Sequence, residues 1–281
     1  MAKNKVKYKA TNKTLRQQIY EFRWIYFLGI PGLLILLLMN YLPMRNLVMA
    51  FQDYNPHLGI LQSPWVGLKH FETLFQDPKF YNMLKNTLII SGLSLLTFPA
   101  PVILALIMNE VRNAKFKKFI QTSVYLPHFL SWAIVASLTF FLLSTEQGFV
   151  NKVAEMMGNE PTAYLFSSKW IYVIIVVQSL WKSVGWGSIV YLAAIAGIDQ
   201  SLYEAAKMDG ANRFQCMWKI TLPSIMPTVM VMLILRMGTI ISVDFEQVFL
   251  MNNAMVKQQL EVFEVYIYNN SIASGSTQYS Y

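Results

Sequence analysis

One stretch of the sequence, residues 201–223, combines the residue types that a protein-docking surface needs. Its first part places small apolar side chains beside charges of both signs, with Glu204, Lys207 and Asp209 as the charged residues. An amphipathic helix presents such a ridge to a groove in a partner protein, and the flanking charges fix its register and its choice of partner. An ordinary amphipathic loop has the same composition, and chemistry alone favours that plainer interpretation.

Local signals in this stretch predict two short helices with a bend between them. Residues 203–208 are good helix formers, and Gly210 can take the left-handed conformation that ends a helix. Pro223 is expected to start a new chain direction, because proline fits the first turn of a helix. The stretch therefore predicts a compact knob.

Two basic residues, Lys182 and Arg236, fall inside long apolar runs. Each would cost roughly 2.5–3.5 kcal/mol on insertion scales if it faced lipid, so both must face protein, water or a solute. They are candidates for a translocation path, with Trp186 offering a flat ring to the solute. The alternative is a structural role, with hydrogen bonds from the cations to backbone carbonyls and ordinary packing or lipid contact for Trp186.

No acidic residue is expected at the depth of these two cations. Asp244 and Glu246 come after the last apolar run, which places them on the outer side. We therefore expect a partner chain to supply the counter-charge.

The elements that must position these residues are membrane-spanning helices. Hydrophobic residues make up 55% of the 281 residues and charged residues only 14%. A hydrocarbon core about 30 Å thick needs roughly 20 mostly apolar residues in helical form. Five runs qualify, and they predict an all-α, polytopic membrane helical bundle with spans at 25–44, 86–108, 120–143, 170–196 and 224–243.

The basic residues sort by side of the membrane. Residues 1–24 form a basic N-terminal segment, and the loops after the second and fourth runs are also basic. Because cytoplasmic loops carry an excess of lysine and arginine, the N-terminus and the loop 198–223 are expected in the cytoplasm. This sorting accounts for the net charge of +8 without nucleic acid as a partner. Residues 25–281 are expected to form a single transmembrane domain.

Groups for catalysis or cofactor binding are missing from the sequence. There is no glycine-rich phosphate loop with a lysine, the three histidines are scattered, and Cys216 is the single cysteine. We expect no enzymatic activity, no cofactor and no metal on this chain.

The spacing of residues 204–223 resembles the EAA motif found in permeases of bacterial binding-protein-dependent ATP-driven (ABC) importers. The matching residues are Glu204, Ala205, Ala206, Gly210, Ile220, Leu222 and Pro223. In that family the segment is a coupling helix that sits in a cleft of the cytoplasmic ATPase subunit. The resemblance implies a coupling surface made of Tyr203, Glu204, Ala205, Ala206, Lys207, Met208, Asp209 and Gly210.

Three further segments, 66–71, 125–127 and 244–250, are similar to permeases that import carbohydrates, particularly oligosaccharides. The resemblance implies the type I importer fold, and a sixth span is expected after Tyr281. It also implies alternating access, in which an extracellular binding protein delivers an oligosaccharide and closure of the ATPase subunits pushes on the helix from Glu204 to Gly210. The implied partners are cytoplasmic ATPase subunits that hold ATP and Mg²⁺, a second and non-identical permease, and the bacterial inner membrane.

Three alternative functions are open to the sequence. An importer permease for an amino acid, a peptide or phosphate would carry the same coupling motif. An ion-coupled secondary transporter would need internal repeats and membrane-embedded acids, and a membrane enzyme would need converging catalytic groups. The sequence favours neither of the last two.

Overall fold

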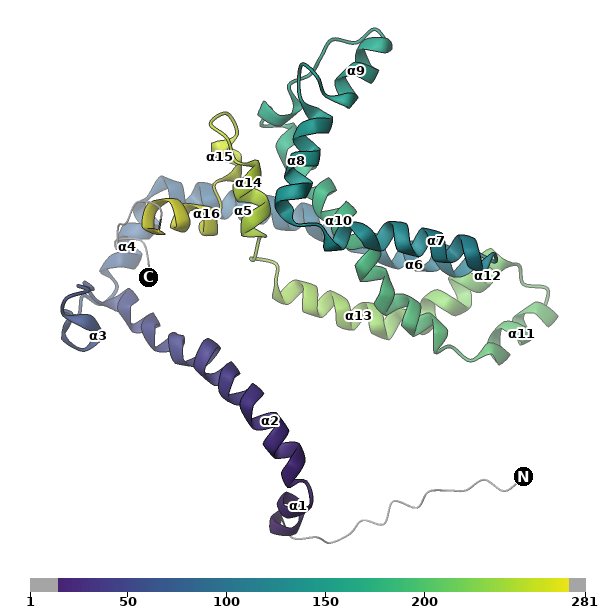
Figure 1. The fold of residues 1–281 in the computed structure, drawn as a ribbon, viewed down its shortest axis with the longest axis horizontal. Coiled ribbons are helices and arrows are strands. Elements are labelled where there is room, and N and C mark those ends of the chain that lie inside the picture. Colours follow the sequence, from purple (N-terminus) through teal and green to yellow (C-terminus); the bar gives the residue numbers. More distant parts are fainter. Residues whose placement is uncertain (1–14, 273–281) are drawn as a thin grey trace. The chain divides into compact units, whose positions relative to one another are not determined.

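The computed structural model describes residues 15–272 of the chain (Figure 1). Within this range the regular elements are helices, apart from one isolated antiparallel bridge between Gln52 and Trp65. The pattern of contacts divides the chain into two compact units that meet after Gln76. Each unit is described by itself below.

The first unit contains one long apolar helix followed by a small loop region. The long helix runs from Arg23 to Phe51 and is long enough to cross a membrane, in agreement with the predicted span 25–44. In the loop, the Phe51 ring stacks on Trp65 at 5.7 Å between centroids. The elements of this unit are α1 (Leu15–Glu21), α2 (Arg23–Leu36), the π-helix η1 (Leu37–Tyr41), the 3₁₀-helix η2 (Leu42–Phe51), α3 (Gly59–Gln62) and α4 (Lys69–Gln76).

The second unit is organised around α10 (Trp170–Ala196), whose bounds coincide with the predicted fourth span. The predicted second span is observed as α5 (Pro78–Leu96) and α6 (Pro99–Glu110), which together form an apolar helix of 33 residues. The two are separated at Thr97 and Phe98, immediately before Pro99. Proline removes a backbone donor and clashes with the preceding turn, so the interruption lies where a proline kink is expected.

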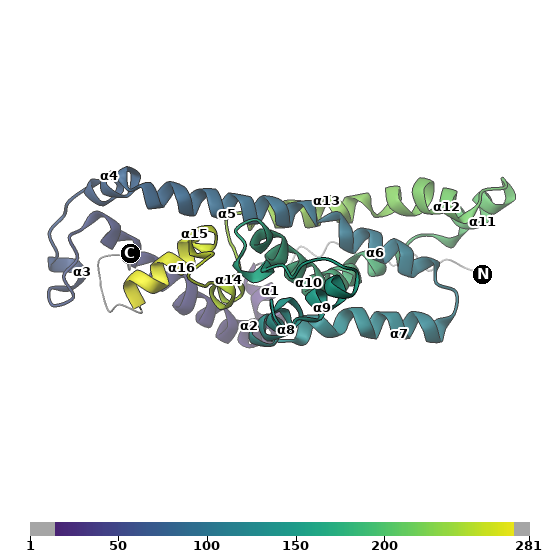
Figure 2. The same cartoon turned by 90° about the horizontal axis from the view of Figure 1, so that it is seen from above.

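The predicted third span, 120–143, is not one continuous helix. The chain instead forms α7 (Ala114–Tyr125), the 3₁₀-helix η3 (Leu126–Phe129) and α8 (Trp132–Leu143), with a bend of 104° between the two parts. Leu130 is extended, and the Ser131 hydroxyl accepts a hydrogen bond from the Ile134 amide to start α8. Figures 1 and 2 show α7 running alongside α6, whereas α8 turns away.

The fifth span also differs from its prediction of 224–243. One continuous helix of 26 residues runs from Arg213 to Gly238, so the chain does not change direction at Pro223. A wide π-turn precedes this proline and accommodates its missing N–H. The helix is built from α12 (Arg213–Cys216), the π-helix η5 (Met217–Thr221) and α13 (Leu222–Gly238).

Most of the remaining short elements pack beside α5, α8 or α10. They are α9 (Phe149–Met156), the 3₁₀-helix η4 (Tyr164–Phe166), α11 (Gln200–Met208), α14 (Phe245–Met251), α15 (Lys257–Leu260), α16 (Phe263–Ile267) and the π-helix η6 (Tyr268–Ile272). Of these, α11 lies apart at the far end of α10 (Figure 1).

Two hydrophobic clusters lie along α10. One joins its first turns, through Ile171 and Ile175, to α5, α8, η4 and α14–α16. The other joins its last turns, through Tyr191 and Ile195, to α6 and α13. Between them α10 carries the polar residues Gln178, Ser179, Lys182 and Ser183. The second unit therefore has two apolar cores separated by a polar level.

Gly185 sets the closest approach between α7 and α10. A Cβ built at this glycine would lie 1.9 Å from the backbone oxygen of Val124. Because the obstacle is backbone, the helices would have to move apart to admit a side chain.

We therefore expect Gly185→Ala to lower the free energy of unfolding by about 1–3 kcal/mol, the usual cost of overpacking. The measurement is thermal unfolding of the purified protein in detergent. Gly92→Ala in α5 is the matched control, since its Cβ would meet nothing within 4 Å. Equal stability of the two variants would contradict the close approach.

Candidate functional site

The predicted coupling segment forms a knob made of α11, a turn and α12. α11 begins at Asp199, whose Oδ1 accepts a hydrogen bond from the Ser201 amide at 3.0 Å. It ends at Met208, and Gly210, two residues later, has a φ of 78°. The amides of Gly210 and Ala211 donate hydrogen bonds to the carbonyls of Lys207 and Ala206. This is the usual helix C-terminus closed by a glycine in the left-handed conformation. The predicted helix, bend and second helix are confirmed.

The start of α12 is fixed by a reciprocal pair of hydrogen bonds. The Asn212 side chain accepts from the Gln215 amide at 2.9 Å, and the Gln215 side chain accepts from the Asn212 amide at 2.8 Å. This capping box satisfies two backbone donors that the helix itself cannot satisfy. Hydrogen bonds thus fix the conformation of the knob at the start of each helix and at the turn between the two helices.

The two faces of α11 differ. Tyr203 and Ala206 are half-buried, and the Tyr203 hydroxyl lies 2.8 Å from Thr221 Oγ1 in η5. The other predicted coupling residues are exposed, with Met208 at 89%. Leu202, also on α11, is 49% exposed. The structure therefore gives Tyr203 a role in holding α11 to η5. It leaves exposed the other predicted coupling residues, Glu204, Ala205, Lys207, Met208, Asp209 and Gly210.

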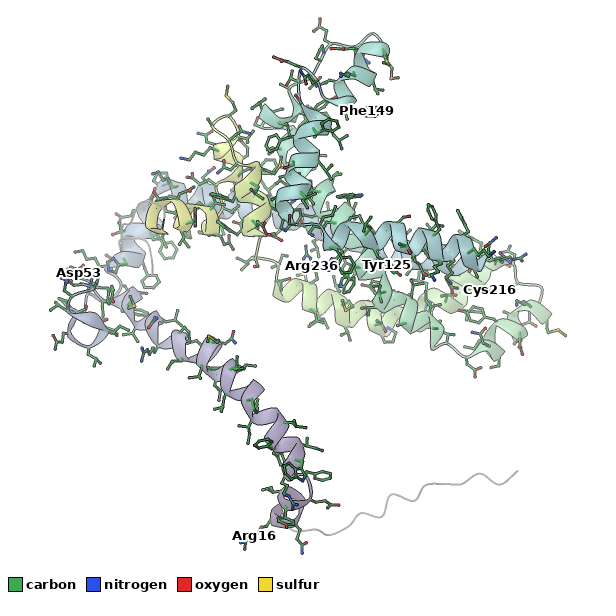
Figure 3. The ribbon with its side chains drawn as sticks, viewed as in Figure 1. Arg16, Asp53, Tyr125, Phe149, Cys216 and Arg236 are labelled. Carbon is green, nitrogen blue, oxygen red and sulfur yellow. The ribbon has the colours of Figure 1, made fainter. Side chains whose placement is uncertain are left out.

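A second site lies at the polar level of α10, as a cavity of about 490 Å³. Lys182 and Arg236 both line it, although they are far apart in the sequence. Figure 3 labels Arg236 near the end of α13, well away from Cys216 in α12. Much of the remaining lining carries hydroxyl groups, which belong to Ser91, Ser94, Ser179, Ser183, Thr239 and Ser242.

The two cations differ in their surroundings. The Lys182 ammonium donates hydrogen bonds to the backbone oxygens of His128 and Leu130, at the bend between η3 and α8. It also lies 5.4 Å from the centre of the Trp132 ring. Lys182 thus has the carbonyl-bonded arrangement that the sequence left open as an alternative. Arg236 is exposed and faces the cavity.

Trp186 is not part of the cavity lining. Its ring stacks on His128 at 4.4 Å with an interplanar angle of 2°, and it meets Phe129 edge-on at 5.7 Å. The structure therefore places this tryptophan against the bend, where it packs, while its outer side is exposed.

Asp244 lines the same cavity as the two cations, so the expectation that no acidic residue lies at their depth is wrong. α13 ends at Gly238, and the non-helical residues that follow bring Asp244 back beside α10. Its Oδ2 accepts a hydrogen bond from Trp132 Nε1 at 2.7 Å. This chain therefore supplies an acidic group to the cavity itself, and Gly238 was the one sequence signal for the early helix end.

Buried amides hold the outer wall of the cavity in place. Gln247 donates to the Ile175 carbonyl at 2.8 Å and to the Gln178 side chain at 3.0 Å, and it accepts from the Ser179 hydroxyl at 2.8 Å. Gln178 in turn donates to Thr139 Oγ1 at 2.6 Å. These bonds fix α14 and α8 on α10, because buried amides lose free energy when left unpaired.

Lys182→Met should destabilise the fold, because it leaves two backbone carbonyls at the bend without their donor. The expected loss is about 1–3 kcal/mol in the free energy of unfolding. Thermal unfolding of the purified protein measures it, with Arg236→Met as the matched cation control that should unfold at the wild-type temperature. A Lys182→Met variant as stable as wild type would contradict the role of Lys182 at the bend.

The cap of α11 should depend on pH. The hydrogen bond from the Ser201 amide lowers the pKa of Asp199, so the cap is complete above the ordinary aspartate range and is lost as pH falls through the lowered pKa. Asp199→Asn should keep the bond and lose the pH dependence, whereas Asp199→Ala should lose the bond at every pH. Hydrogen–deuterium exchange of residues 200–204, corrected for intrinsic rates, is the measurement. Equal protection in all three proteins would contradict the cap.

Comparisons with known proteins relate the chain to importer permeases. The family model described as "Binding-protein-dependent transport system inner membrane component" matches residues 97–243. Protein LplB of Bacillus subtilis (strain 168) is 48% identical over 259 residues, which cover 92% of this chain and 81% of that protein. The polygalacturonan/rhamnogalacturonan transport system permease protein YteP of the same organism is 45% identical over 273 residues, covering 97% and 85%.

Solved structures give the same relationship. A chain from a bacterial ABC transporter involved in the import of the acidic polysaccharide alginate matches with a TM-score of 0.85 and 39% identity, over 95% of this chain and 91% of that one. The alginate transporter in complex with its alginate pentasaccharide-bound periplasmic protein matches with a TM-score of 0.84. The chain therefore belongs to the family of binding-protein-dependent transport system inner membrane components, the multi-pass permease subunits of ABC importers.

Proposed function

We propose that this permease carries an oligosaccharide through the cavity beside α10, by alternating access between the two sides of the membrane. The observation that carries the proposal is the cavity itself, in which hydroxyls, Arg236 and Asp244 converge among membrane-spanning helices. Sugars present many hydroxyl groups, which pair with such donors and acceptors. The polysaccharide substrates named for YteP and for the alginate importer favour a sugar over an amino acid, a peptide or phosphate.

The exposed face of α11 is proposed to dock into a cytoplasmic ATPase subunit. Leu202 and Met208 offer apolar contact there, beside Glu204, Lys207 and Asp209. Helix-in-groove docking uses such an apolar ridge, with flanking charges that set the register. ATP and Mg²⁺ bind to that separate subunit, which performs the hydrolysis.

The remaining partners complete an importer. A second, non-identical permease forms the other side of the path, and an extracellular binding protein delivers the sugar. The periplasmic protein in the alginate complex supports the last of these partners. The basic segment 1–24 supports an N-terminus in the cytoplasm, with the chain in the inner membrane of a bacterium.

Co-purification and stimulated hydrolysis test the proposal. The permease should be recovered with an ATPase and a second permease, and its binding protein loaded with an oligosaccharide should stimulate ATP hydrolysis. Recovery of the chain alone would count against the assembly. A binding protein that accepts no oligosaccharide would contradict the carbohydrate substrate.

Glu204→Lys should weaken attachment of the ATPase, because it reverses a charge at the docking surface. Membrane insertion should be unchanged, and both the co-purified ATPase and the stimulated hydrolysis should fall about tenfold, corresponding to roughly 1.4 kcal/mol. Glu155→Lys in α9 is the control for a charge reversal at another exposed site. Normal transport by Glu204→Lys would refute the coupling role.

A further inference from the structure

Asp244 occupies a helix start without capping the helix. Five other polar residues at helix starts accept hydrogen bonds from the first amides of their own helices, namely Asp77, Asn113, Ser131, Asp199 and Asn212. Asp244 precedes α14 in the same way, but its carboxylate makes no such bond. It accepts instead from Trp132 Nε1 in α8, 112 positions away in the sequence. The carboxylate is thus turned from its own helix toward the cavity.

Trp132 is itself held in place. Its ring lies 5.4 Å from the Lys182 ammonium, and that ammonium is fixed by the carbonyls of His128 and Leu130. A cation over an indole face is attracted by the ring, so the contact orients the tryptophan. Because the indole nitrogen can only donate, its partner must be an acceptor such as the Asp244 carboxylate.

The second oxygen of Asp244 is free for a ligand. In the part of the chain between residues 15 and 272, its Oδ1 accepts no protein hydrogen bond. Asp244 is exposed, and it shares the lining with Arg236. A carboxylate accepts and a guanidinium donates, so the two offer complementary partners to the polar groups of a sugar in the cavity.

We propose that Asp244 is a specificity-determining residue for the sugar in the cavity, and that Trp132 is the positioning residue that aims its carboxylate. The proposal rests on the function proposed above, passage of an oligosaccharide through this cavity. Asp244 accepts from sugar hydroxyls and repels a sugar carboxylate. A uronate unit therefore passes with its carboxylate toward Arg236 and its hydroxyls toward Asp244.

The test uses the complete importer in proteoliposomes, with its binding protein and internal ATP. The probe is a pectin digest that contains both neutral and uronate-containing oligosaccharides, and mass spectrometry identifies what is imported. The readout is sugar imported per ATP hydrolysed. Asp244→Asn and Trp132→Phe are compared with Glu246→Gln and Trp181→Phe, an acid and a tryptophan outside the cavity lining.

Asp244→Asn should lower the sugar imported per ATP about tenfold, the order expected for loss of a charged hydrogen bond. It should also shift the imported mixture toward uronate-rich chains, because the repulsion is removed. Trp132→Phe should lower the ratio about threefold, and the double variant should be no worse than Asp244→Asn. The control variants Glu246→Gln and Trp181→Phe should import sugar and hydrolyse ATP at the wild-type rates, whereas a merely structural defect in a cavity variant would lower import of all chains alike and leave the imported mixture unchanged.

Wild-type import ratios and mixtures in both cavity variants would overturn the proposal, and so would losses that add in the double variant. If the Asp244→Asn importer does not assemble, the import ratio of Trp132→Phe alone tests the proposal. Phenylalanine keeps an aromatic ring beside Lys182 and lacks the N–H that donates to Asp244. If the wild-type importer takes up no oligosaccharide, that result would contradict the proposed function and therefore also this inference.

Discussion

The bond between the Lys182 ammonium and the carbonyls of His128 and Leu130 is the interaction on which the second unit depends. A bend of 104° leaves backbone groups without their helical partners, and a membrane has no water to replace them. The lysine supplies that replacement from α10. Its charge is tolerable at this depth because it is surrounded by carbonyl oxygens and an aromatic ring rather than lipid.

Other interruptions lie at the same level of α10. α5 gives way to α6 at Thr97 and Phe98, and these residues line a pocket with Ser183, Arg236 and Thr239. α13 ends at Gly238, and the chain continues through the cavity lining to Asp244. Irregular backbone at membrane depth is found where it is buried in protein or lines a cavity. The helix interruptions therefore lie around the cavity, and the continuous helix α10 packs beside all of them.

Local signals predicted the elements that depend on local chemistry. The turn at Gly210 followed from the freedom of glycine at positive φ, and the bounds of α10 followed from its long apolar run. The bend before Trp132 was missed because α8 is as apolar as a straight span would be, so hydropathy does not distinguish them. The hydrogen bond between Trp132 and Asp244 joins distant parts of the chain, and no periodic pattern carries such a contact.

The predicted pair of cations shows how structure divides residues that the sequence treats alike. Lys182 and Arg236 raised the same problem of a charge among apolar residues, and both line the cavity. The Lys182 ammonium donates its hydrogen bonds to backbone carbonyls of its own chain, so these donors stabilise the fold. Arg236 is exposed and lies near the end of the helix Arg213–Gly238. That helix begins with α12, which is part of the knob. Because Tyr203 ties the knob to Thr221 within that helix, a displacement of α11 acts on a continuous rod about 39 Å long. Arg236, the exposed cation of the cavity, thus lies on the helix that a movement of the proposed docking surface would shift.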